Sequence, residues 1–141
     1  MAAKDIYHEH VKTALVKDGW QITHDPLRLD FGEKYTLVDL GAERFLAAEK
    51  DKLKIAVEIK SFVGKSTLDD LEKALGQFVL YHDILKENEP ERILFLAVRE
   101  SVFDNVSDAP YWNLLLQNQR LRLIVFDPAT EEITQWIPQI I

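Results

Sequence analysis

The segment from residue 53 to residue 99 constrains the fold most strongly, because it places a long helix between two apolar strands. Residues 53–62 and 92–99 are apolar and rich in β-branched side chains, a pattern typical of buried strands. Ser66 fits the N-cap of the intervening helix, and Pro90 prevents that helix from continuing. Residues spaced by three and four form one stripe along this predicted helix: Leu68, Leu71, Leu75, Phe78, His82 and Leu85.

Shorter periodic segments lie on both sides of this unit. Helices are predicted at residues 4–18 and, after a loop at residues 102–110, at residues 111–118. Strands are predicted at residues 20–23, 27–31, 35–40, 122–127 and 133–137, the last at a sheet edge, while residues 45–50 fit either a strand or a helical turn. This order indicates an α/β (or α+β) fold, with a mixed β-sheet flanked by helices. The 141 residues suit one domain, residues 1–141, with one hydrophobic core.

Composition excludes several classes of protein. Without cysteine, the chain has no disulfide, no thiolate nucleophile and no cysteine-based zinc site. No apolar run approaches the roughly 18 residues of a membrane span, and MAAKDIYHEH lacks the apolar part of a signal peptide. We therefore expect a cytoplasmic protein with no membrane association. The net charge of −7 lacks the basic excess that is typical of nucleic-acid binders.

Two charged residues interrupt the apolar segment IAVEIKSF at residues 55–62. Because successive strand side chains point to opposite faces, Glu58 and Lys60 share a face with Ala56, and the intervening aliphatic residues take the other face. One explanation is that this face lies in water, which is common in antiparallel sheets. Ala56 and Phe62 weaken that explanation, since they make the same face partly apolar.

Further polar positions lie before and after this strand. Asp39, in TLVDLG, is unusual inside a strand, and strand statistics alone favour a strand-end residue that begins a turn. Gln77 and Tyr81, four residues apart, lie on one helix face beside the apolar stripe. Half-buried residues at the border of the core would have the same pattern. Gly76 costs about 1 kcal/mol relative to alanine inside a helix, which predicts the close approach of another segment.

Taken together, the order of these residues indicates a metal site, although none of them indicates it alone. Two carboxylates from adjacent strands, Asp39 and Glu58, can hold Mg²⁺, which prefers oxygen ligands and substrate phosphates. The backbone carbonyl of Ile59 would supply a third ligand. Lys60 would reach the same place, where its ammonium group can stabilise charge developing at phosphorus or help to position an attacking water. A half-buried Glu–Lys pair is tolerable when its charges are paired or bound to a metal.

This order resembles the motif of the PD-(D/E)xK nuclease superfamily, whose members share the restriction-endonuclease-like fold. Asp39 resembles its first acid, and Glu58 with Lys60 resembles its (D/E)xK pair. Gln77 and Tyr81 resemble the QxxxY motif of its RecB-type branch. The proline of the motif is missing, since Val38 precedes Asp39.

The resemblance implies a cofactor and a set of site residues. The cofactor would be Mg²⁺ or Mn²⁺, and the catalytic residues would be Asp39, Glu58, Lys60 and Gln77. In many members a glutamate on the first helix completes the metal site, and Glu9 is the candidate here, beside Asp39, Glu58 and the carbonyl of Ile59. Contacts to the substrate are expected from Gln77, Tyr81 and Lys73.

Over nearly its whole length the chain is similar to the XisH-type family of cyanobacteria, the fdxN element excision controlling factors. The segments that carry this resemblance are KDIYHEHVKTALVKDGW, LVDLGAE, LAAEKDKLKIAVEIKSF, ALGQFVLYHDIL and RLIVFDP. It implies a nuclease-like protein that controls site-specific excision of a DNA element, with DNA and a small XisI-type protein as partners. Whether the chain forms a homodimer stays open.

Two functions remain open at this point. The first is Mg²⁺-dependent phosphodiester hydrolysis of DNA at the Asp39, Glu58 and Lys60 site; RNA as the substrate is not separated from DNA. The acidic net charge opposes this function, but six lysines cluster in sequence around the site: Lys50, Lys52, Lys54, Lys60, Lys65 and Lys73. The second function is a catalytically silent module that binds the small partner protein and steers a recombinase, which the acidic charge favours.

Two other groups of residues receive no functional assignment. His8 and His10 are two apart, so on a helix they do not face the same way, and we expect them at the surface rather than in a metal site. Trp20, Trp112 and Trp136 are expected in the core rather than on a platform for stacked bases.

Overall fold

A six-stranded mixed sheet forms the centre of the molecule in a computed structural model that describes residues 4–45 and 52–140. The strand order is β1-β4-β5-β6-β7-β8. The strands are β1 (Gln21–His24), β4 (Leu40–Phe45), β5 (Lys52–Ile59), β6 (Arg92–Arg99), β7 (Leu123–Asp127) and β8 (Glu132–Ile137). The β5–β6 and β6–β7 pairs are parallel and the other pairs are antiparallel. The predicted mixed sheet is thus confirmed, and β8 is an edge strand as expected.

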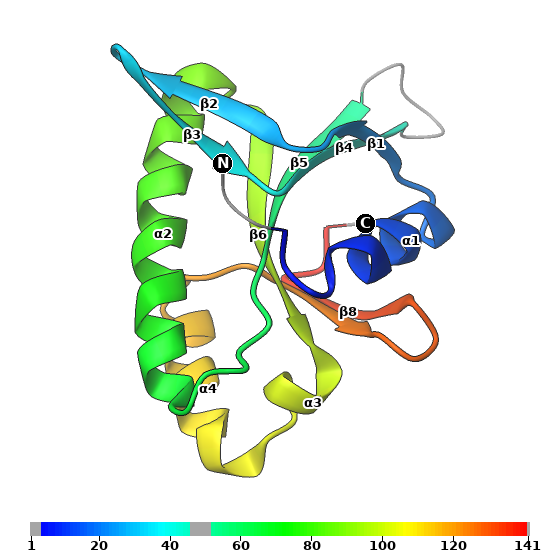
Figure 1. Ribbon diagram of the computed structural model, residues 1–141, viewed down its shortest axis with the longest axis vertical. Helices are drawn as coiled ribbons and strands as arrows, with labels where there is room; N and C mark the ends of the chain where they lie inside the picture. The colour runs from blue at the N-terminus through cyan, green and yellow to red at the C-terminus, as the bar shows by residue number, and fades with distance from the viewer. Residues whose placement is uncertain (1–3, 46–51, 141) are drawn as a thin grey trace.

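Helices cover both faces of this sheet (Figure 1). α1 (His8–Lys17) lies on one face, and α2 (Thr67–Asn88) runs along the other, on the same side as α4 (Ala109–Gln117). α3 (Glu100–Phe103) and a 3-10 turn (Val106–Asp108) connect β6 to α4, where the sequence suggested only a loop. Among the described residues, no helix is long and apolar enough to span a membrane.

A separate hairpin packs against α2. It consists of β2 (Leu27–Phe31) and β3 (Lys34–Val38), which form a two-stranded antiparallel sheet. Leu27 and Leu29 are buried in the core beneath α2, and the Asn88 side chain at the end of α2 donates to the Asp30 carbonyl at 2.8 Å. The hairpin therefore extends the cover that α2 provides on this side of the sheet.

The alternation of side chains in β5 divides the core into two parts. Ile55, Val57 and Ile59 pack in the cluster on the α1 side, whereas Ala56 packs in the cluster on the α2 side. The face that Ala56 shares with Glu58 is therefore covered by α2 rather than exposed to water. Trp20 and Trp112 are buried and Trp136 is partly buried, as expected for core residues.

α2 begins as the sequence predicts, with the Ser66 Oγ accepting a hydrogen bond from the Asp69 N–H at 3.2 Å. The predicted stripe is only partly correct, because Leu68 is exposed and His82 lies at the border of the core. The buried residues are Leu71, Ala74, Phe78, Tyr81, Ile84 and Leu85. Gly76 is exposed, and apart from its own helix backbone no atom of the described residues lies within 4 Å of an added Cβ, so the predicted close approach of another segment is wrong.

Some predicted boundaries also differ from the structure. The strand predicted at residues 35–40 is two strands, because the chain bends at Asp39 as it passes from the hairpin into the central sheet. β5 ends at Ile59, so residues 60–62 leave the strand. α1 begins four residues later than predicted, after a turn in which Asp5 Oδ1 accepts from the Tyr7 N–H at 2.9 Å. Phe45 ends β4, and residues 46–50 lie outside the described residues.

Candidate functional site

Asp39 and Glu58 meet where β5 ends and β4 begins. The Ile59 N–H donates to Asp39 Oδ2 at 2.7 Å, and the Asp39 N–H donates to Glu58 Oε1 at 3.3 Å. These two bonds hold each carboxylate against the backbone of the other strand. The predicted convergence of Asp39 and Glu58 is therefore present in the structure.

Glu58 is buried, with only 7% of its surface exposed. Burial and the neighbouring Asp39 carboxylate raise the pKa of Glu58 to about 8, and the Lys60 ammonium opposes this increase. A buried carboxylate is costly because the surrounding low-dielectric interior solvates charge poorly. The explanation that Glu58 stands on a solvated strand face is therefore wrong.

Lys60 and Ile59 contribute from the same end of β5. Lys60 Nζ lies 3.7 Å from Glu58 Oε2, and the Lys60 side chain is partly exposed. The N–H and C=O of a strand residue point to the same neighbouring strand, so the Ile59 carbonyl lies on the side of Ile59 that faces Asp39. Two carboxylates, one carbonyl and one ammonium group therefore meet at this strand end.

This donor set fits a hard divalent cation. Asp39 and Glu58 supply carboxylate oxygens and Ile59 a carbonyl oxygen, the ligand types that Mg²⁺ prefers. Within residues 4–45 and 52–140, no three His, Cys, Asp or Glu side chains are grouped to hold a metal. Mg²⁺ commonly binds through one or two carboxylates plus substrate phosphates, so two acids are enough for it.

Glu9 does not join this group. Its side chain is 70% exposed and lies 3.7 Å from Lys4 Nζ and 3.9 Å from Lys12 Nζ. The prediction of Glu9 as a further metal ligand is therefore not supported, because on α1 this side chain points to solvent and to two lysines. The structure leaves Asp39, Glu58 and the Ile59 carbonyl as the candidate ligands.

The three residues predicted on α2 lie in different surroundings. Lys73 is exposed and lines a pocket together with Lys60. Gln77 is half-buried, and its buried Oε1 atom has no hydrogen-bond partner among the described residues. Tyr81 is 8% exposed and packs in the core on the α2 side, so its predicted contact with substrate is not supported.

Five of the six lysines that cluster in sequence are described by the structure, and these five do not cluster in space. Lys52 and Lys54 lie at the start of β5, at the opposite end of the strand from Glu58, and pair with Glu43 at 3.2 Å and Glu91 at 3.5 Å. Lys65 is exposed, and Lys50 lies outside the described residues. Of the five described lysines, Lys60 and Lys73 alone line the pocket next to Glu58.

His8 is buried rather than exposed, so that prediction is wrong. It is 3% exposed, and its Nε2 lies 2.7 Å from Asp25 Oδ1. Lys12 Nζ lies 2.7 Å from the other oxygen of Asp25. Burial raises the pKa of Asp25, but the hydrogen bonds from Lys12 and His8 outweigh it and hold the pKa below its usual value. His10 lies nearer the surface, 3.1 Å from Glu131 Oε2.

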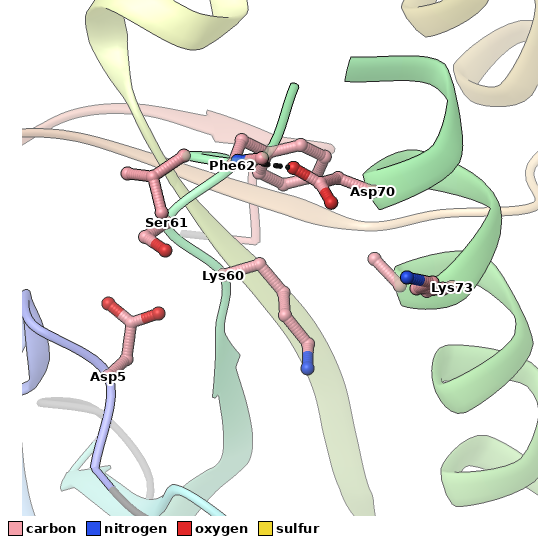
Figure 2. Close-up of a pocket in the computed structure, with 9 residues that line it drawn as sticks. Asp5, Lys60, Ser61, Phe62, Asp70 and Lys73 are labelled. Atoms are coloured by element: carbon pink, nitrogen blue, oxygen red, sulfur yellow. Dashed lines mark hydrogen bonds between the residues drawn. The ribbon is translucent and has the colours of Figure 1, made fainter. Parts of the chain in front are cut away.

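Sequence reasoning missed several residues around Lys60. Figure 2 shows Asp5 and Asp70 beside the loop that follows β5, and both line the pocket that Lys60 and Lys73 share. Arg99, at the carboxyl end of β6, donates to the Ser61 carbonyl at 2.8 Å. The position of Arg99 at the end of the apolar segment RILFLAVR is a signal that could have indicated it.

The chain is similar to two solved structures. The first is a crystal structure of an XisH family protein from Nostoc punctiforme, 37% identical, with a TM-score of 0.83 over 94% of this chain and 99% of that one. The second is an fdxN element excision controlling factor protein from Anabaena variabilis, 40% identical, with a TM-score of 0.81 over 95% of this chain and 99% of that one. Among curated proteins, none matches this chain.

A family model gives the same assignment. The model described as XisH protein matches residues 1–134, which include every candidate site residue named above. The chain therefore belongs to the XisH family.

Proposed function

We propose that this protein is a metal-dependent nuclease-like factor that acts on DNA during the controlled excision of a DNA element. The observation that carries this proposal is the joined pair of Asp39 and Glu58, with Lys60 Nζ 3.7 Å from Glu58 Oε2. The XisH membership and the related protein described as an fdxN element excision controlling factor support the biological setting. The arrangement of Asp39, Glu58 and Lys60 on adjacent strand ends also supports a restriction-endonuclease-like core.

Each residue would contribute a distinct part of phosphodiester hydrolysis. Asp39, Glu58 and the Ile59 carbonyl would hold Mg²⁺ or Mn²⁺, which polarises a phosphoryl oxygen and lowers the pKa of a bound water. The Lys60 ammonium would stabilise negative charge that develops on the phosphoryl group. Gln77, whose buried Oε1 has no partner among the described residues, would accept a hydrogen bond from a group that arrives with the substrate.

A second function is favoured by the net charge of −7. In this alternative the protein is a catalytically silent module that binds a small XisI-type protein and steers a recombinase. An acidic surface suits a protein partner better than it suits bare DNA. The buried Asp39–Glu58 pair would then be structural and would bind no metal.

Calorimetric titration with Mn²⁺ separates the two functions. We expect one binding event in the wild-type protein, its loss in Asp39→Asn, and its retention in Glu9→Gln. Asparagine at position 39 keeps an oxygen that can accept from the Ile59 N–H, so the fold should survive while the negative charge is removed. Glu9→Gln removes the same charge from an exposed position outside the site.

Two outcomes would count against the nuclease-like proposal. Absence of Mn²⁺ binding by the wild-type protein at millimolar metal would favour the silent module. Binding that survives Asp39→Asn but disappears in Glu9→Gln would place the metal elsewhere on the protein. Magnesium should give the same pattern, since Mg²⁺ and Mn²⁺ share the preference for carboxylate, carbonyl and water ligands.

A further inference from the structure

A pocket of about 270 Å³ opens beside Lys60, between the loop that follows β5 and the start of α2 (Figure 2). Lys60 lies between Asp5 on one side and Lys73 on the other. Because Lys60 Nζ is also 3.7 Å from Glu58 Oε2, the pocket adjoins the candidate metal site. We propose that this pocket binds a phosphate group of a nucleic-acid strand, next to the phosphodiester on which the metal site would act.

Contacts from β6 fix the part of the loop that carries Lys60. The Lys60 N–H donates to the Ala97 carbonyl at 3.2 Å, which continues the β5–β6 pairing one residue past the strand. Arg99 Nη2 donates to the Ser61 carbonyl at 2.8 Å. The Lys60 side chain therefore extends from backbone that is attached to the central sheet.

The rest of the loop is attached to α2 and α4. The Gly64 N–H donates to Asp70 Oδ2 at 3.0 Å, and a Cβ at position 64 would lie 2.6 Å from that oxygen, so the contact requires glycine. Phe62 has a left-handed backbone (φ 53°), which a bulky residue keeps only where its surroundings hold it. Its buried ring packs against Trp112, with 5.6 Å between the ring centroids. The wall of the pocket is therefore formed before any ligand arrives.

The pocket lining holds two ammonium groups, from Lys60 and Lys73, and two carboxylates, from Asp5 and Asp70. Lys73 has no acidic partner among the ion pairs of residues 4–45 and 52–140, and Asp70, one turn before it on α2, accepts from the loop instead. Asp5 is the acid on the opposite side, and its Oδ1 is engaged by the Tyr7 N–H. The ammonium groups of Lys60 and Lys73 thus share one small pocket, and lysine binds phosphate as a point charge.

The phosphate of a strand could come from two sources. One is a terminal 5′-phosphate, and the other is an internal phosphodiester one nucleotide away from the reacting position. Both present the same negatively charged oxygens to Lys60 and Lys73. This inference rests on the proposed function, because it assigns to the pocket a second phosphate of the same strand that would meet Asp39 and Glu58.

The test is the binding of fluorescein-labelled single-stranded DNA in EDTA, measured by anisotropy for Lys73→Gln and Lys86→Gln. Lys86 is a matched control, since it lies on the last turn of the same helix, is exposed, and has no acidic partner among the described ion pairs. We expect Lys73→Gln to weaken binding about fivefold or more. It should also reduce the slope of log K against log salt by about 0.7, the value for one phosphate contact to a single strand. Lys86→Gln should change neither quantity.

Oligonucleotides with and without a 5′-phosphate distinguish the two sources. Loss of affinity only for the phosphorylated strand assigns the pocket to a terminal phosphate, and equal loss for both strands assigns it to an internal phosphodiester. Equal effects of Lys73→Gln and Lys86→Gln, or no binding by the wild-type protein at low salt, would overturn the inference. The binding measurement needs no divalent metal, so its result does not depend on whether Asp39 and Glu58 bind a metal. Failure of the phosphate pocket can therefore be distinguished from failure of the proposed metal site.

Discussion

Replacing Glu58 by glutamine is expected to lower the rate of Mg²⁺-dependent DNA cleavage by roughly 10³-fold or more. The carboxylate would be one of two charged metal ligands, and metal stabilisation of the transition state contributes several kcal/mol, with about 1.4 kcal/mol for each tenfold in rate. Glutamine has the shape of the protonated side chain at this buried position, so the fold should remain intact. Single-turnover cleavage of supercoiled and branched DNA measures the effect.

Lys60→Met provides the comparison for this prediction. We expect it to lower the cleavage rate by about 10²–10³-fold, the usual cost of removing one group that stabilises transition-state charge. Mn²⁺ affinity should persist in Lys60→Met, because the ammonium group is not a ligand, and should be lost in Glu58→Gln. Wild-type cleavage rates in Glu58→Gln would show that the activity does not come from this site.

The free energy of unfolding is expected to fall between pH 5 and pH 9 in the metal-free protein because of Glu58. Burial and the Asp39 carboxylate raise the pKa of Glu58 to about 8 in the folded protein, against 4.5 for an ordinary glutamate. As the pH rises, Glu58 therefore loses its proton at a lower pH in the unfolded chain than in the folded protein. The contribution of Glu58 to stability is full below about pH 4.5 and is lost as the pH rises through 8. At about 1.4 kcal/mol for each unit of pKa, the loss over the shift from 4.5 to about 8 is on the order of 5 kcal/mol.

Urea denaturation of the wild-type protein and of Glu58→Gln, across this pH range in EDTA, isolates the effect. Glutamine does not titrate, so the stability of the variant should fall less with pH, and the variant should be the more stable protein at pH 9. Mg²⁺ should reduce the difference between low and high pH in the wild-type protein, because a bound cation favours the charged carboxylate. Parallel stability curves for the two proteins would mean that Glu58 titrates normally.

The sequence was sufficient to predict the pairing of Asp39 and Glu58 near Lys60. Strand alternation places Glu58 and Lys60 on the face of Ala56, and the structure shows that α2 covers this face. Strand statistics favoured a strand end at Asp39, and the chain bends there. Alternation did not show the bend, because Leu37 to Leu40 keep the pattern of one strand while the chain changes partners from β2 to β1 and β5. The choice of partner strand depends on the tertiary structure, and the two-residue alternation of side chains does not indicate it.

The first helix shows what the sequence could not predict about His8 and Glu9. Adjacent helix residues point about 100° apart, so His8 and Glu9 have different surroundings. His8 can be buried because Asp25, 17 residues away, accepts a hydrogen bond from its ring. The residues next to His8 in the sequence do not indicate such a distant partner. Glu9, the next residue, is the exposed one. The pocket residues Asp5 and Asp70 were missed for the same reason, since the loop after β5 brings them together.

The central claim is that Asp39, Glu58 and the Ile59 carbonyl bind one divalent cation. Crystals grown or soaked in Mn²⁺ and measured at the manganese absorption edge test it directly. We predict one anomalous peak roughly 2.1 Å from a carboxylate oxygen of Asp39, a carboxylate oxygen of Glu58 and the Ile59 carbonyl oxygen. An anomalous map with no peak at this strand end, or with its peak on other residues, would contradict the account.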